Sequence, residues 1–270
     1  MKKQTFNLLF YICALLCMAS CDTATNNSQP TPNGLTETEE DSLAPIPSAS
    51  TILNASSSTT NVDATNTQPI TLEIDGFIHP TEWVPGQTAT ITFNQFPTSA
   101  TAFRQVLEKY GNKPEVAVLL QLMAFEIYNH NKEEGLSCIE MINVENNVDN
   151  VVRILKDRYN PAYGEYYTPQ LVATFLKGTS PENAYKADKP FTIQVRSHKA
   201  NKYQDSNTLK GVVLYLEVYS SGYDTHWRGI SVVKSKGSSI YKVVNSPALY
   251  TQCQPVSFKI EEEYTDIWHQ

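Results

Sequence analysis

The pattern of apolar and polar positions divides the chain from residue 70 onward into a block of helices and then a block of strands. Between residues 99 and 178, apolar side chains recur every three or four positions, which is the period of an α-helix. After residue 190 they recur every second position, which is the period of a β-strand. Helices followed by strands are typical of α+β domains with a mostly antiparallel sheet. The sequence therefore predicts this fold class.

Two short alternating segments come before the helices, at residues 72–75 and 88–93. Each predicts a half-buried strand. A turn-rich piece containing Pro80, Pro85 and Gly86 separates them. The predicted domain therefore begins with an N-terminal strand pair.

The helical block contains the clearest start and stop signals. Thr98 or Ser99 is expected to cap a first helix that ends at Gly111, and Pro114 is expected to open a second. This second helix is apolar on nearly all faces, which predicts a buried core helix. The pattern predicts three further helices and one short turn, at residues 132–142, 148–160, 168–178 and 180–182.

Alternating segments in the last third predict the main sheet. They lie at residues 191–196, 212–219, 230–233, 241–244 and 256–260. Lys236-Gly237-Ser238 separates the third and fourth of these segments, and such a short Gly-containing connection is typical of a β-hairpin.

The first twenty residues have the parts of an export signal. Lys2 and Lys3 precede an apolar run over residues 6–19, and Ala19-Ser20 is followed by Cys21. This arrangement resembles the bacterial lipoprotein signal, which implies that Cys21 carries a diacylglycerol and becomes the acylated N-terminus. Two alternatives are weaker: cleavage after Ser20 needs a small residue where Met18 stands, and an apolar run of about 14 residues is short for a membrane anchor. The sequence thus predicts an exported protein of the bacterial cell envelope, attached to a membrane through lipid on Cys21.

The next segment, residues 21–69, is rich in Ser, Thr, Asn and Pro and is acidic. It has no aromatic residue, so it cannot bury enough apolar surface to offset the entropy of ordering. We expect a disordered linker with an end-to-end distance of roughly 40 Å. The predicted organisation is a signal at 1–20, the linker at 21–69 and a single globular domain at 70–270.

Charge and cysteine content narrow the function of the domain. The net charge of the chain is −7, and the signal and linker account for part of it, which leaves the domain close to neutral without a basic cluster. Nucleic acid is therefore not an expected partner. The domain contains Cys138 and Cys253. An exported protein could join them in a disulfide, but we favour two separate structural cysteines, because Cys138 lies in an apolar helical segment.

Three pieces of the sequence resemble a bacterial family of domains of unknown function, the one numbered 6935. They are Phe96-Pro97-Thr98-Ser99, the segment 177–185 followed by Lys189-Pro190, and Ser220-Ser221-Gly222 with a closing hairpin over residues 236–241. The resemblance covers about residues 90–245. It implies limits for the domain and no activity, cofactor or site residue.

Two aromatic loops are the candidate contact surfaces, at residues 163–167 and 219–228. Exposed rings beside charged groups can stack on sugars or anchor a protein partner. The candidate contacts are Tyr166, Tyr167, Tyr223, Asp224, His226, Trp227 and Arg228. The alternative, which we favour, is that these rings cover the ends of the core.

The sequence predicts no catalytic residue, metal site or cofactor. Its five histidines are scattered, without the paired spacing of zinc sites. We therefore expect a binding or accessory domain for a protein, peptide or glycan partner. The alternative is an envelope hydrolase, which would require a pocket that brings together at least two of Glu217, Asp224, His226 and Arg228.

Overall fold

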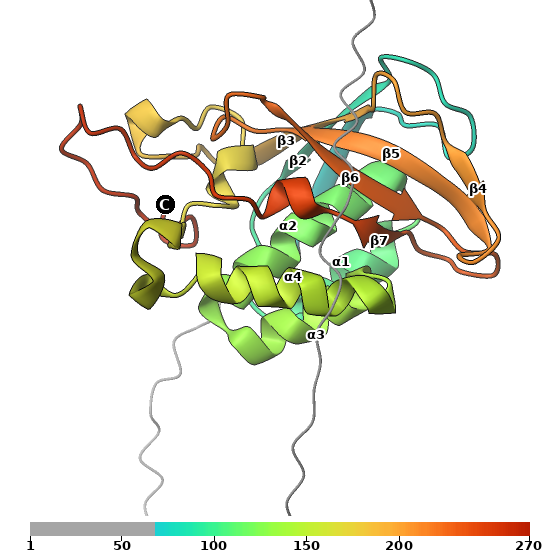
Figure 1. Ribbon diagram of the computed structural model, residues 1–270, viewed down its shortest axis with the longest axis horizontal. Coiled ribbons are helices and arrows are strands. Elements are labelled where there is room, and N and C mark those ends of the chain that lie inside the picture. The colour runs from blue at the N-terminus through green and yellow to red at the C-terminus, as the bar shows by residue number, and fades with distance from the viewer. Residues whose placement is uncertain (1–67) are drawn as a thin grey trace, which may run out of the picture. The chain divides into compact units, whose positions relative to one another are not determined.

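The computed structural model describes residues 68–270, and it has the expected α+β fold (Figure 1). Cys21, the export signal and nearly all of the predicted linker lie outside the described residues. Among residues 68–270, no helix combines the length and the apolar character that crossing a bilayer requires.

Seven strands form one sheet in the order β1-β2-β3-β5-β6-β7, with the short β4 also paired to β5. All neighbouring strands are antiparallel. The predicted N-terminal strand pair is β1 and β2, which continues into the main sheet through β3. The strands span Leu72–Gly76 (β1), Thr88–Phe93 (β2), Phe191–Ser197 (β3), Gln204–Ser206 (β4), Gly211–Tyr219 (β5), Trp227–Val233 (β6) and Lys242–Asn245 (β7).

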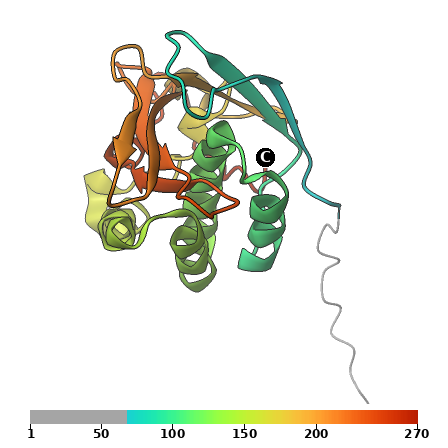
Figure 2. The same ribbon diagram turned by 90° about the vertical axis from the view of Figure 1, so that its right-hand side faces the viewer.

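The sheet arches over a group of four helices, as Figure 2 shows. These helices span Ala100–Tyr110 (α1), Pro114–His130 (α2), Lys132–Ile142 (α3) and Glu145–Arg158 (α4). The central helix is α2, which packs against α1 and α3 on its helical side and against β2, β3, β5, β6 and β7 on its sheet side. Contact on all sides explains why α2 is apolar nearly all round, as predicted.

Local signals set the ends of the helices. The hydroxyl of Ser99 accepts a hydrogen bond from the backbone N–H of Ala102 and caps α1, and the N–H of Gly111 donates to the carbonyl of Leu107 where α1 ends. Asn131 caps α3, because its Oδ1 accepts from the N–H groups of Glu133 and Glu134.

The predicted helix at residues 168–178 is wrong. The segment contains only a 3₁₀ turn, Ala173–Phe175, although its apolar residues are buried as the pattern indicated. The Thr174 hydroxyl donates to the carbonyl of Leu171, and the Thr179 hydroxyl donates to those of Ala173 and Leu176. These hydroxyls occupy carbonyl groups that would accept backbone N–H groups in a continuous helix. The segment therefore forms a series of turns in place of a helix.

The predicted strand at residues 256–260 is also wrong. The Ser257 N–H donates to the Pro181 carbonyl, but the segment does not form a ladder of hydrogen bonds with a neighbouring strand. The Phe258 ring is 92% exposed, so it does not face the core. The disulfide alternative is wrong as well, because Cys138 and Cys253 are buried free thiols.

Candidate functional site

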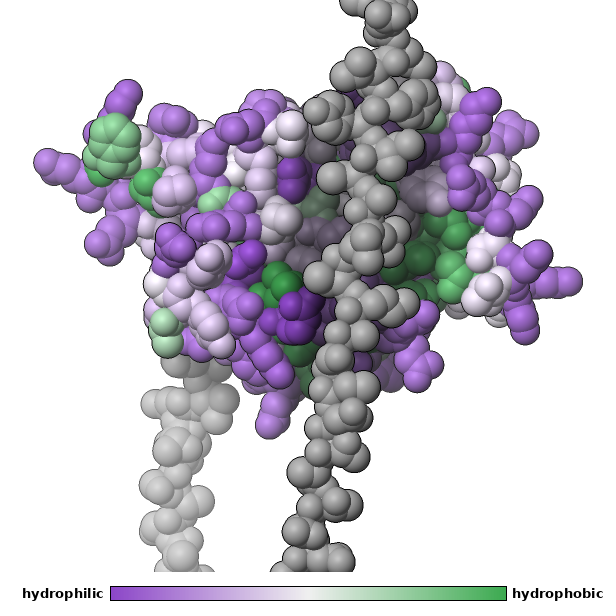
Figure 3. Space-filling model, in the orientation of Figure 1, coloured by the Kyte–Doolittle hydropathy of each residue, from purple (hydrophilic) through white to green (hydrophobic). Residues whose placement is uncertain are grey.

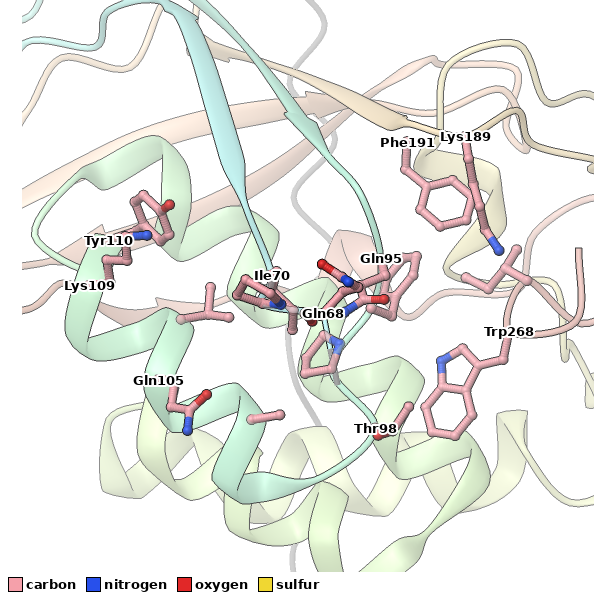
Figure 4. Close-up of a pocket in the computed structure, with 16 residues that line it drawn as sticks. Gln68, Ile70, Gln95, Thr98, Gln105, Lys109, Tyr110, Lys189, Phe191 and Trp268 are labelled. Atoms are coloured by element: carbon pink, nitrogen blue, oxygen red, sulfur yellow. Dashed lines mark hydrogen bonds between the residues drawn. The ribbon is translucent and has the colours of Figure 1, made fainter. Parts of the chain in front are cut away.

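A cavity of about 620 Å³ lies where the chain enters the domain. It is bounded by residues 68–70, by α1, by the loop after β2 and by the C-terminal tail, which we define as residues 264–270 (Figure 4). Its lining residues are Gln68, Pro69, Ile70, Gln95, Phe96, Pro97, Thr98, Ala102, Gln105, Val106, Lys109, Tyr110, Lys189, Phe191, Ile267 and Trp268. We call it the entry cavity.

The entry cavity combines aromatic rings with amide and ammonium groups. Figure 4 shows Lys109 and Tyr110 at one end, Lys189, Phe191 and Trp268 at the other, and the amides of Gln68 and Gln95 between them. The Lys189 ammonium donates to the carbonyl of Gln270 over 2.8 Å. The cavity therefore has a cation at each end and hydrogen-bonding amides along its length.

Three ionisable side chains meet at the C-terminal end of α2. The His130 Nε2 atom lies 3.1 Å from Oε1 of Glu126 and 3.0 Å from Oδ2 of Asp266. Glu126 and His130 are one turn apart on α2, whereas Asp266 comes from the C-terminal tail. The imidazole also stacks on the Trp268 ring, with centroids 3.6 Å apart and planes 12° from parallel. We call Glu126, His130 and Asp266 the tail cluster.

Burial and mutual contact shift the pKa values in the tail cluster. Burial raises the pKa of Glu126 to about 7, against the opposing effect of its hydrogen bond to His130. Burial alone would lower the pKa of His130, but the hydrogen bonds to Asp266 and Glu126 outweigh it and raise that pKa to about 9. Burial of Asp266 is likewise outweighed by its bond to His130, so its pKa is lowered.

Buried polar atoms without hydrogen-bond partners surround this cluster. Among the described residues these include Oε2 of Glu126 and the hydroxyls of Tyr159 and Tyr264. Burial raises the pKa of both tyrosines, and the negative charge of Glu126 raises it further, so both hydroxyls lie within electrostatic reach of that carboxylate. One histidine and two carboxylates thus meet at this point, with two phenols within electrostatic reach, and the histidine and carboxylates are a set able to ligate a metal ion or to hold a proton.

Sequence reasoning missed the tail cluster. A search for histidine pairs cannot find it, since it contains one histidine. The spacing of four residues between Glu126 and His130 is the signal that could have found half of it, because it places both side chains on one helix face. No local signal relates either residue to Asp266.

The structure separates most of the aromatic residues singled out from the sequence. Tyr166 and Tyr167 are exposed at the end of a 3₁₀ segment, Pro161–Tyr166, whereas Tyr223 is buried and donates its hydroxyl proton to the carbonyl of Thr251. Arg228 lies over the Tyr223 ring at 4.1 Å. Its guanidinium donates to Ala248, Thr225 and Thr251. Tyr223 therefore covers the end of the core, as the favoured interpretation expected, whereas the exposed rings of the first loop do not.

The other residues of the second loop lie nearer the surface. Asp224 accepts from the Gln254 amide, and the exposed His226 stacks on Tyr219 with centroids 5.3 Å apart. The half-buried Trp227 packs under the guanidinium of Arg196 at 3.9 Å.

The face drawn in Figure 3 is mostly hydrophilic, with its apolar side chains in small patches.

The four residues of the hydrolase alternative do not converge. Glu217 pairs with Arg196 at 2.7 Å and with His198 at 3.6 Å. No side-chain hydrogen bond or ion pair of the described residues joins Glu217, Asp224, His226 and Arg228 to one another. None of the four lines the entry cavity or the smaller cavity, of about 380 Å³, beside α4.

The fold and the cavity define an α+β domain in which an arched antiparallel sheet packs on a central helix. Residues 95–257 of the chain match the family described as Domain of unknown function (DUF6935), and the protein belongs to this family. The match begins just after β2 and stops before the tail, so the family region contains Glu126 and His130 but not Asp266 or Trp268. Neither a curated protein nor a solved structure matches the chain.

Proposed function

We propose that this protein is a bacterial envelope lipoprotein, anchored through lipid on Cys21, whose domain binds an extended peptide or glycan in the entry cavity without catalysing a reaction. The lipoprotein-like signal supports the anchor, and the acidic segment after it supports a long tether between lipid and domain. The composition of the entry cavity supports binding.

The observation that carries the proposal is the set of groups lining the entry cavity. A volume of about 620 Å³ falls in the range of small-ligand sites, roughly 300–1,000 Å³. The partly exposed rings of Tyr110 and Trp268 can stack on sugar faces or on the side chains of a peptide, and the buried rings of Phe96 and Phe191 form an apolar wall behind them. The side-chain amides of Gln68 and Gln105 can both donate and accept hydrogen bonds, as recognition of peptide groups or hydroxyls requires.

The same lining supports binding over catalysis. Of the described residues around the entry cavity, none is a carboxylate, a histidine, a cysteine or a serine, so neither a Ser–His or Cys–His arrangement nor a pair of carboxylates lines the cavity. Lys109 and Lys189, at opposite ends, favour a ligand with negative charge toward its ends. Two of the sequence pieces that resemble the family lie at this cavity, because Phe96, Pro97, Thr98 and Lys189 line it.

A photo-crosslinking experiment in intact cells tests the binding site. A benzophenone amino acid is placed at Gln105, which lines the entry cavity, or at Glu108, which is exposed on the same helix and does not line it. We expect adducts from the Gln105 position only. Digestion of the adduct with a protease or with glycosidases then identifies its class. Equal adducts at both positions, or none at Gln105, would overturn the proposal.

The anchor has a separate test. A metabolic fatty-acid probe is expected to label the wild-type protein and to leave Cys21→Ser unlabelled, since the acyl chains require the thiol. Labelling of the variant would contradict the lipoprotein assignment while leaving the binding site untouched.

A further inference from the structure

The tail cluster has the arrangement of a metal site. Its three donor atoms, Nε2 of His130 and one carboxylate oxygen each from Glu126 and Asp266, all lie within 4.8 Å of one another. Ligands bound to a common zinc ion at about 2.1 Å in tetrahedral geometry lie roughly 3.4 Å apart. The separations of 3.1 and 3.0 Å from His130 to the two carboxylates are close to that value. An ion could therefore be accommodated with small side-chain shifts.

Unpartnered atoms at the same place are an independent sign of a missing ligand. Glu126 is fully buried, and its second oxygen has no hydrogen-bond partner among the described residues. Tyr159, which is 6% exposed and whose pKa the charge of Glu126 raises, also has an unpartnered hydroxyl. Buried polar atoms nearly always have partners, because an unpaired atom loses its hydration without a compensating hydrogen bond. A cation bound to Glu126 would engage its unpartnered oxygen.

We propose that Glu126, His130 and Asp266 bind one divalent transition-metal ion of the zinc type. The donor set selects this class: imidazole nitrogen suits zinc, copper, iron and nickel, whereas calcium and magnesium prefer oxygen ligands alone. Two carboxylates supply the negative charge that balances a dication. The bond from Nε2 to the metal replaces the N–H bond of the apo state, and that proton is released to solvent.

A metal at this position would link two parts of the chain that are far apart in sequence. Glu126 and His130 belong to the rigid core helix α2, and Asp266 belongs to the C-terminal tail. Trp268, which lines the entry cavity, stacks on the ligating imidazole. Metal binding would therefore hold one wall of the entry cavity in place. The metal site itself does not depend on the proposed binding function.

Calorimetric titration of the untagged, chelator-treated full chain with Zn²⁺ tests the proposal. We expect one site per chain, with affinity reduced by about 100-fold or more in His130→Gln and Asp266→Asn. The matched control is His269→Gln, which changes an exposed histidine in the same tail and should bind as the wild type does. The Co²⁺-loaded wild type is expected to show the visible absorption of a tetrahedral site.

Three results separate a metal site from a hydrogen-bonded contact. Absence of saturable Zn²⁺ binding by the folded wild type would overturn the proposal, as would Zn²⁺ binding that survives in both ligand variants. Saturation by Ca²⁺ or Mg²⁺ at equal affinity would overturn the assigned metal class. Circular dichroism verifies that the variants are folded. Asp266→Asn alters a partly exposed tail residue, so this variant keeps the test valid if His130→Gln is unstable.

Discussion

The imidazole of His130 and the indole of Trp268 lie face to face, with ring centroids 3.6 Å apart. One ring ends the core helix α2, and the other belongs to the C-terminal tail. Together with the ion pair from His130 to Asp266, this stack attaches the tail to the core. Because Trp268 and Ile267 line the entry cavity, the attachment also shapes that cavity.

Trp268→Ala is expected to release the tail. It removes the stack and the apolar contact of the indole, at a cost of about 2 kcal/mol in the free energy of unfolding. Hydrogen exchange read by mass spectrometry should show faster exchange over residues 264–270, and urea denaturation should show the loss of stability. The control is Phe258→Ala, whose ring is 92% exposed and should matter little. Unchanged exchange in the tail of Trp268→Ala would contradict the attachment.

Gly135→Ala is expected to separate α3 from α2. A Cβ atom at residue 135 would lie 2.1 Å from the Cα atom of Tyr128, and a backbone atom of a core helix cannot move aside cheaply. We expect a loss of about 1–3 kcal/mol in thermal or urea unfolding. Gly229→Ala is the matched control, since a Cβ there would meet nothing within 4 Å. If the two variants are equally stable, the close approach of the helices is not as described.

Arg196 and Glu217 are expected to be energetically coupled. The carboxylate is buried, and Arg196→Met would leave His198 as its remaining ion-pair partner among the described residues. We expect this variant to lose about 1–3 kcal/mol of stability. Adding Glu217→Gln removes the uncompensated charge and should recover part of the loss. A double-mutant cycle measures this coupling, and additive effects of the two substitutions would argue against it.

Cys138 and Cys253 are expected to resist alkylation in the native state. Burial raises the pKa of each thiol to about 12, so little thiolate is present near neutral pH. Iodoacetamide treatment followed by peptide mass mapping should show both sites unmodified in the folded protein and fully modified in denaturant. Rapid labelling of either cysteine in the folded protein would show that its segment opens easily.

Most helices could be predicted because their signals are local. Ser99, Gly111 and Pro114 mark helix ends through contacts within a few residues, and the apolar period marks the faces between them. The same reasoning failed at residues 168–178, because the hydroxyls of Thr174 and Thr179 bind the carbonyls there. The three-residue strand β4 was not predicted, since a polar edge strand is too short to show a period.

The sequence by itself determined the fold class and the buried character of α2, since both depend on spacing along single elements. Only the tertiary structure decided which distant residues come together. Asp266 and Trp268 reach His130 because the tail folds back onto the core, and the entry cavity exists because residues 68–70, α1, β3 and the tail meet. Such contacts depend on how elements far apart in the sequence pack together, and the spacing of apolar and polar residues within one element does not specify that packing.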